Sequence, residues 1–324
     1  MRLAAHEAGL QRTILPGSRP DFSAAALDDL IRHPHFDQAL VTSARCTVEQ
    51  WQASWTLNRV MSDRGRAVAV LMTLDLYYAA ADRAGLALVQ LREEAARHGF
   101  ASAGRITAWV ATMRVLGFLA VHVPGRPQRV VPTTKFLAML RDGLERNWRS
   151  LAQLHPHGQQ AIERLEDDTF LRHVVRGFIG PYRNGQRVLD AVPELAAIAD
   201  REAAICILFS MLLRDACGEP ISIARLAREF FVSRAHVRSL LRAMEAMGLL
   251  SRSHAAGGYR PGPGFRPCVS RLMAALFQAH IFATDRALVL CGALEADSAA
   301  AYHSVPDTSP ATEHGGTANP WPVP

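Results

Sequence analysis

Apolar residues along most of the chain recur every three or four positions, the spacing of one face of an α-helix. This pattern predicts helices over 23–32, 35–44, 47–60, 66–83, 88–98, 103–116, 133–151, 159–178, 194–215, 222–230, 234–247, 266–282 and 285–295. Strand signals are few and short, and they comprise FLAVHV after Gly117, QRVVP ending at Pro132 and LLSRS after Gly248. We therefore expect a mainly α protein with small β elements.

The hydrophobic pattern occurs twice along the chain. Residues 97–119 (RHGFASAGRITAWVATMRVLGFL) align with 228–250 (REFFVSRAHVRSLLRAMEAMGLL) at an offset of 131, with six identities in 23 positions. Further upstream, the apolar helix 66–78 parallels 202–214, and 33–44 parallels 167–178. Because these matches keep the same order over most of the chain, they predict the duplication of one unit of about 130 residues.

The two copies and their composition predict four regions. Residues 23–160 hold the first copy with flanking helices, and residues 161–295 hold the second. Residues 1–22 are expected to be a flexible N-terminus. Residues 296–324 have no Lys or Arg and many Pro, Gly, Ser and Thr, which is typical of a disordered tail.

Each copy has the same internal order of predicted elements. In the second copy an apolar helix and a short helix precede Ser233, a residue type that caps helix N-termini. The helix 234–247 follows, ends at Gly248, and leads into a hairpin around HAAGG. In the first copy Ser102 and Gly117 take the places of Ser233 and Gly248.

With IARLAREFFVSRAHVRSLLRAMEAMGLLSR and LREEAARHGFASAGRITAWVATMRVLGFLAV, the chain resembles the winged helix-turn-helix superfamily, most closely MarR-like transcriptional regulators. The resemblance covers residues 66–141 and 202–272. It implies a fold of tandem duplicated winged helix-turn-helix units with small β-hairpin wings and additional long helices. MarR-like proteins generally carry one such unit per chain and dimerise, so two units here imply an intramolecular pseudo-dimer, and a further homodimer stays open.

The resemblance implies double-stranded DNA as the partner, because the second helix of such a motif lies in the major groove and the wing lies over the backbone or minor groove. The expected contacts of the second copy are Arg225, Arg228, Ser233, Arg234, His236, Arg238, Ser239, Arg242, Arg252 and Arg260. The expected contacts of the first copy are Ser102, Arg105, Thr107, Ala108, Thr112, Arg126 and Arg129.

The two copies differ in their predicted reading helices. Arg234, Arg238 and Arg242 recur once per helical turn, and arginine binds guanine in a bidentate manner. They align with Ala103, Thr107 and Ala111 in the first copy. We therefore expect the second copy to be the stronger base reader, with the first copy contributing phosphate contacts and a different half-site.

The charge distribution favours the same function. The chain carries a net charge of +6, with 35 arginines and the single lysine Lys135, a skew that codon bias explains. Residues 88–141 carry a net +6 and residues 221–271 a net +7, which leaves −7 for the rest. Codon bias acts everywhere, so it does not explain this partition, which is the electrostatic footprint of a nucleic-acid binder.

Composition and motifs exclude several other classes. The five cysteines (Cys46, Cys206, Cys217, Cys268 and Cys291) lack C-x-x-C spacing, and no signal-peptide core or membrane-spanning apolar run occurs. We expect a cytoplasmic, nucleoid-associated bacterial protein with no membrane partner. No nucleophile, zinc-protease or dinucleotide motif is present, so we expect no enzyme and no cofactor.

Some alternatives stay open. His33-x-His35 and His155-x-His157 have the spacing of metal ligands but no Cys or acid cluster nearby in sequence, so no metal is expected. Trp51, Trp55, Trp109 and Trp148 are interpreted as core residues rather than an effector pocket. A plasmid-type replication initiator also uses two winged helices, and a winged-helix scaffold binds only protein. Neither the operator, nor an effector, nor the choice between activator and repressor follows from the sequence.

Overall fold

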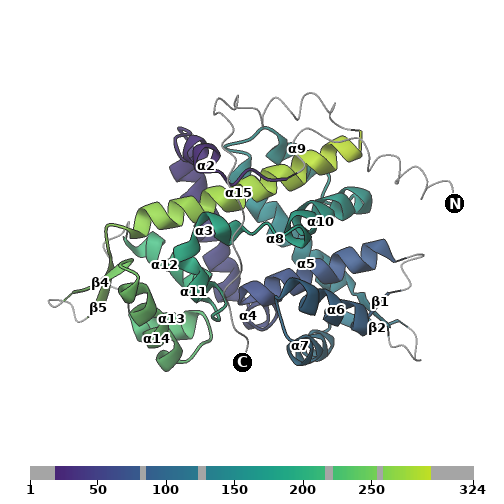
Figure 1. Ribbon diagram of the computed structural model, residues 1–324, viewed down its shortest axis with the longest axis horizontal. Coiled ribbons are helices and arrows are strands. Elements are labelled where there is room, and N and C mark those ends of the chain that lie inside the picture. Colours follow the sequence, from purple (N-terminus) through teal and green to yellow (C-terminus); the bar gives the residue numbers. More distant parts are fainter. Residues whose placement is uncertain (1–18, 81–84, 123–128, 216–221, 254–257, 293–324) are drawn as a thin grey trace, which may run out of the picture.

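The computed structural model describes residues 19–80, 85–122, 129–215, 222–253 and 258–292. It is mainly helical, with small antiparallel sheets toward its two ends (Figure 1). The α-helices are α2 (Ala24–Ile31), α3 (Phe36–Ala53), α4 (Trp55–Met61), α5 (Arg64–Ala79), α6 (Leu88–His98), α7 (Ala103–Val115), α8 (Thr134–Leu151), α9 (His157–Glu163), α10 (Asp168–Arg183), α11 (Ala196–Ala199), α12 (Ala204–Asp215), α13 (Ile223–Glu229), α14 (Arg234–Ala246) and α15 (Phe265–Leu290). The short 3-10 helices are η2 (Val188–Ala191) and η3 (Pro193–Leu195), and the strands are β1 (Leu86–Ala87), β2 (Leu119–Val121), β3 (Arg129–Pro132), β4 (Leu250–Ser253) and β5 (Gly258–Pro261).

One order of elements occurs in two parts of the chain, which we call the first unit (64–151) and the second unit (204–290). In the first unit the long helix α5 leads to α6, α7, the hairpin β2–β3 and α8. In the second, α12 leads to α13, α14, the hairpin β4–β5 and α15. The sequence pattern also missed β1, which adds a third strand in the order β1-β3-β2.

Local chemistry sets the ends of α7 and α14. The Ser102 and Ser233 hydroxyls accept hydrogen bonds from the backbone N–H groups three residues on, at 3.3 and 3.1 Å. Both helices are followed by left-handed glycines, Gly117 (φ 75°) and Gly248 (φ 72°). These four residues confirm the predicted caps.

The faces of α7 and α14 that turn inward are the predicted ones. Ile106, Trp109, Val110 and Met113 are buried in α7. The buried residues of α14 are Val237, Leu240, Leu241 and Met244, which occupy the same positions in the aligned sequences. The opposite face of each helix carries the exposed residues, such as Arg105 on α7 and Arg234 on α14.

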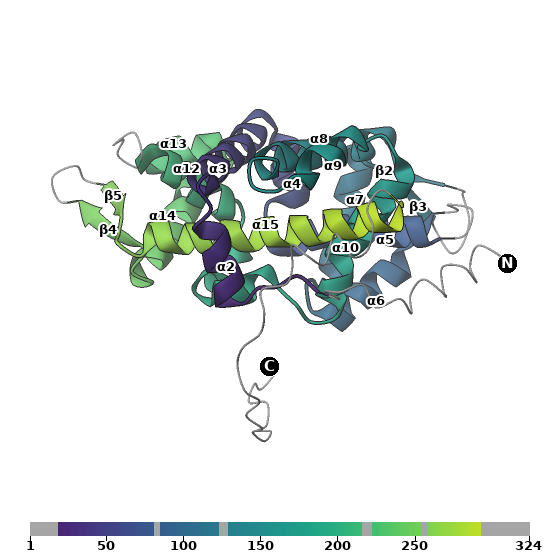
Figure 2. The same cartoon turned by 90° about the horizontal axis from the view of Figure 1, so that it is seen from above.

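Helices outside the two hairpins connect the first unit to the second unit. Helix α3 packs against α12 of the second unit, while α10 packs against α5 of the first unit and along α15. Helix α15 runs nearly the length of the molecule in both views (Figures 1 and 2). As a result, the buried residues form one continuous core rather than one core per half.

Several predicted boundaries are wrong. In place of the predicted helices 35–44 and 47–60, the structure has α3 followed by the short α4. In place of the predicted helices 266–282 and 285–295, it has the single helix α15. The predicted helix 159–178 divides into α9 and α10, because the Asp167 carboxylate caps α10 by accepting from Thr169 N (2.8 Å) and Phe170 N (3.2 Å). The predicted helix 194–215 also divides, near Ala203, whose backbone is left-handed (φ 57°).

The tryptophan prediction holds only in part. Trp109 and Trp148 are buried in the core, and Trp51 packs against it. Trp55 is 46 % exposed, with the Arg59 guanidinium 5.3 Å from its ring centre, so the core interpretation is wrong for this residue. None of the described helices is long and apolar enough to span a membrane.

Candidate nucleic-acid interface

The outer face of α14 is lined with arginine. Arg234, Arg238 and Arg242 are exposed and follow one another at helical spacing, while the opposite face packs into the core. A helix fixed by a buried apolar face holds its exposed side chains at constant spacing. The packing of α14 therefore fixes the backbone positions of these three arginines.

Five arginines of the second unit are exposed and form no hydrogen bond or ion pair with the part of the chain that the structure describes. They are Arg228, Arg234, Arg238, Arg242 and Arg260. They come from α13, α14 and β5, which lie at the same end of the molecule in Figure 1. Unneutralised guanidinium groups on neighbouring elements are what a polyanion requires.

The other predicted contacts of the second unit serve within the chain. Arg225 donates to the Glu229 carboxylate at 2.8 Å, and Arg252 donates to Glu245 at 2.9 Å and lies 5.8 Å from the Tyr259 ring centre. The hydrogen bond to Glu245 raises the pKa of the Arg252 guanidinium. Both arginines stay about half exposed, so they still add positive potential to the surface.

His236 and Ser239 hold α14 to the chain segment that precedes α12. The imidazole Nε2 of His236 lies 2.9 Å from the carbonyl oxygen of Glu202. The Arg201 guanidinium donates to the Ser239 hydroxyl at 2.8 Å and to its carbonyl at 3.2 Å. These two predicted contact residues therefore also fix the helix to the rest of the chain, and Ser233 acts as its cap.

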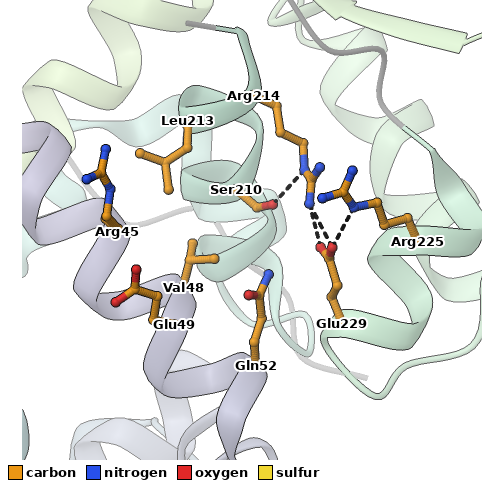
Figure 3. Close-up of a pocket in the computed structure, with 9 residues that line it drawn as sticks. All are labelled: Arg45, Val48, Glu49, Gln52, Ser210, Leu213, Arg214, Arg225 and Glu229. Carbon is orange, nitrogen blue, oxygen red and sulfur yellow. Dashed lines mark hydrogen bonds and ion pairs between the residues drawn. The ribbon is translucent and has the colours of Figure 1, made fainter. Parts of the chain in front are cut away.

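Helix α13 is fixed by an ion-pair cluster at a pocket between α3, α12 and α13 (Figure 3). Figure 3 shows Arg214 and Arg225 converging on Glu229, with Arg214 also donating to the Ser210 hydroxyl at 3.2 Å. Arg45, Glu49 and Gln52 of α3 line the other wall. At this pocket α13, which carries Arg225 and Arg228, therefore lies next to α3, which precedes the first unit in the chain.

The corresponding residues of the first unit are mostly engaged. Arg105 pairs with Asp63 at 2.8 Å, and the Thr107 hydroxyl accepts from the Arg92 guanidinium at 3.0 and 2.7 Å. The Arg129 guanidinium donates to the Gly85 carbonyl at 3.0 Å.

The remaining predicted contacts of the first unit offer little charge to a ligand. The Thr112 hydroxyl donates to the Ala108 carbonyl at 2.9 Å, and Ser102 serves as a cap. Ala108 is exposed, and Arg126 lies outside the described residues. The two units differ in degree. In the first unit Arg92, Arg105 and Arg129 bind within the chain and Arg114 is exposed without a partner among the described residues, whereas five arginines of the second unit have none there.

A chain of polar contacts joins the N-terminal ends of α14 and α7. From His236 at the start of α14 it passes to Glu202, whose carboxylate accepts from Arg66 at 3.1 Å. The Arg66 side chain lies 3.3 Å from the Asp63 carboxylate, which pairs with Arg105 of α7. These residues are far apart in sequence, and neither periodicity nor motif signals their contact. The two helices are thereby fixed relative to each other.

Comparison with known proteins adds no assignment, since the chain matches no family model, no curated protein and no solved structure.

Proposed function

We propose that this protein is a sequence-specific, double-stranded DNA-binding regulator of transcription. In this proposal both units are winged helix-turn-helix units that arose by duplication, with α14 and α7 as their second helices and β4–β5 and β2–β3 as wings. One chain then acts as a pseudo-dimer with two non-equivalent reading surfaces. The proposal rests on one observation above all: five arginines on and beside α14 are exposed and have no partner among the residues that the structure describes.

The arrangement of these arginines fits a groove-reading helix. Arg234 and Arg238 lie toward the N-terminal end of α14, the part that reaches base edges in helix-turn-helix proteins. Arg228 on the preceding helix and Arg260 on the hairpin lie on the elements that contact phosphates. In this geometry the central arginines select guanine and the outer ones set the register.

The first unit has a different role in the proposal. Its second helix, α7, offers Ala103, Ala108 and the engaged Thr107 in place of a stripe. We therefore assign it phosphate contacts and positioning over a neighbouring half-site. The polar contacts through Arg66 set the distance between the two half-sites.

The proposal is tested by selecting binding sites from a random duplex pool and measuring affinity for the best site by fluorescence anisotropy. Arg238→Ala is expected to weaken binding by about 10- to 100-fold and to relax selection at one position, because a bidentate arginine–guanine contact supplies about 1–3 kcal/mol. Arg32→Ala is the matched control, since Arg32 is an exposed arginine at the end of α2, away from α14 in Figure 1.

Three outcomes separate this function from its rivals. Equal losses from Arg238→Ala and Thr107→Ala contradict the asymmetry of the two units. Retention on DNA that does not weaken with rising salt, or no retention at all, favours a protein-binding scaffold. Bound sites confined to a replication origin in genome-wide mapping favour an initiator, whereas sites at many promoters support a regulator.

A further inference from the structure

Two histidines and an aspartate from distant parts of the chain meet in the core. His155 and His157 lie between α8 and the start of α9, and Asp285 lies within α15. Their side chains are nearly inaccessible, with 6 %, 5 % and 2 % of each residue exposed. The sequence alone predicts no metal at His155-x-His157, because no Cys or acid cluster lies nearby along the chain. The fold corrects this point by bringing in Asp285.

The three groups lie close enough to share one ligand. The His157 Nδ1 atom is 2.8 Å from Asp285 Oδ1, and His155 Nε2 is 3.7 Å from Asp285 Oδ2. One nitrogen from each imidazole and one carboxylate oxygen all lie within 4.8 Å of one another. A small inward movement of these side chains is enough to place all three atoms around a single ion.

Packing of the surrounding helices fixes this arrangement. The residue before Asp285 is Thr284, whose hydroxyl accepts a hydrogen bond from the Trp148 indole at 2.9 Å, near the end of α8. Helix α9 packs against both α8 and α15. The backbone elements that carry the three side chains are therefore held together independently of any ion.

The chemistry of the three groups selects a class of ion. Two neutral imidazoles and one carboxylate form a donor set typical of first-row divalent metals, whereas Mg²⁺ and Ca²⁺ prefer oxygen donors. Burying a carboxylate among apolar helices is costly unless positive charge or hydrogen bonds compensate for it. A divalent cation supplies that charge at the point where the three donors meet.

We propose that His155, His157 and Asp285 form a binding site for one first-row divalent transition metal, with Zn²⁺ as the reference ion. Three protein donors leave a fourth position for water. The proposal stands apart from DNA binding, because it rests only on side chains in the core.

The site has a consequence for the whole molecule. Helices α8 and α15 each begin close after a hairpin, β2–β3 and β4–β5 respectively, and the cluster lies where the C-terminal parts of both helices meet. An ion that joins α15 to the segment between α8 and α9 restricts how the two units lie relative to each other. Metal binding is thus expected to raise the thermal stability of the full chain.

The chain contains its own control for this site. His33 and His35 have the same H-x-H spacing, but His35 is exposed, and they lie in the link between α2 and α3. The described residues form one buried His/Cys/Asp/Glu cluster with metal-ligand geometry, and it is the one at Asp285. A double variant His33→Gln/His35→Gln removes an H-x-H pair without touching the proposed site.

The experiment uses the full chain, stripped with a chelator and dialysed against Zn²⁺ or Co²⁺, with Mg²⁺ in parallel. Metal content per chain is measured by mass spectrometry, and the coordination of Co²⁺ is followed by visible absorption. We expect one Zn²⁺ per chain and a higher Tm for the unsubstituted protein and for His33→Gln/His35→Gln. Asp285→Asn, which keeps the size of the side chain, is expected to weaken Zn²⁺ binding by at least about 100-fold.

Two results overturn the proposal. One is an unsubstituted chain that takes up no Zn²⁺ and shows no Co²⁺ band, which leaves the cluster a hydrogen-bonded network only. The other is a folded Asp285→Asn protein with unchanged Zn²⁺ affinity. If circular dichroism shows that Asp285→Asn does not fold, His155→Gln replaces it, and loss of binding in that folded variant supports the site.

Discussion

Phe231 closes the turn between α13 and α14 with a left-handed backbone (φ 54°). In the first unit Gly99 takes this conformation after α6 (φ 65°). The two turns share a hydrogen bond from the next residue back into the helix, Phe100 N to Ala95 O at 3.2 Å and Val232 N to Ala227 O at 3.0 Å. A left-handed backbone costs an L-residue roughly 1–2 kcal/mol, and Phe231 is 42 % exposed, so the burial of the rest of its ring offsets that cost.

We predict different effects from substitutions at these two positions. Gly99→Ala is expected to lower the free energy of unfolding by about 1 kcal/mol, because a Cβ there meets no atom within 4 Å and only the backbone conformation is penalised. Phe231→Gly is expected to lower it by about 1–2 kcal/mol, because the lost burial of the ring outweighs the relief of the backbone. Urea unfolding measures both, with Gly104→Ala as control. Equal stability of Gly99→Ala and the unsubstituted chain would contradict the assignment of strain.

At the scale of elements, tertiary partners override local signals for a helix end. Thr284 and Asp285 interrupt an apolar pattern, so the sequence predicts a break in α15 there. The helix continues because Thr284 accepts from Trp148 and Asp285 lies against His157. Conversely, Asp167 ends a predicted continuous helix by capping α10. A polar residue in an apolar helical pattern either ends the helix or is buried within it. Which of these occurs depends on its hydrogen-bond partners in the fold, which the local sequence pattern does not show.

The crossing of α10 and α15 gives an element-scale prediction. A Cβ at Gly177 would lie 2.7 Å from the Ala283 Cα, whereas a Cβ at Gly180 on the same helix meets nothing within 4 Å. Gly177→Ala is therefore expected to destabilise the protein by about 1–3 kcal/mol through overpacking. Gly180→Ala is expected to change the stability by less than about 1 kcal/mol, because its gain in helix propensity is opposed by crowding of the new Cβ against Pro181, the next residue. Thermal unfolding compares them, and a neutral Gly177→Ala would show that the two helices are not in close contact.

At the scale of the whole molecule, the two units are joined by helices that cross between halves and by ion pairs near the starts of α5 and α12. Arg66 contacts Glu202 and the Asp63 carboxylate, whose side chain is 3 % exposed. Arg64 pairs with Asp200 at 2.6 Å, but that pair is exposed to solvent. Buried ion pairs are costly to break, because the remaining charge stays buried, whereas exposed pairs contribute little.

Arg64 and Arg66 allow a matched test of the ion pairs that join the two units. Arg66→Met is expected to lower the free energy of unfolding by about 2–3 kcal/mol, since it removes a charged hydrogen-bond donor from Asp63 and Glu202. Arg64→Met is expected to cost less than about 1 kcal/mol. Guanidinium unfolding of the intact chain measures both losses in one cooperative transition. A larger loss from Arg64→Met than from Arg66→Met would show that the exposed pair holds the halves together.

The sequence by itself determined the ends and the buried faces of α7 and α14. The 3.6-residue period specifies which side of α7 and α14 is buried, and Ser102, Ser233, Gly117 and Gly248 specify where the helices begin and end. These signals are local, because a helix face or a cap involves residues within a few positions of one another. The arginine stripe of α14 follows from the same period.

Only the tertiary structure decided which charges are available. Arg105 and Arg234 are exposed arginines in the first turns of α7 and α14, yet Arg105 pairs with Asp63 and Arg234 has no partner among the described residues. The meeting of His155 and His157 with Asp285 likewise joins residues more than a hundred positions apart. Such contacts depend on how α3, α10 and α15 cross between the halves. The hydrophobic period predicts which side chains are buried, but it does not show which group an exposed arginine contacts. It therefore cannot distinguish an arginine that is paired within the chain from one that is not.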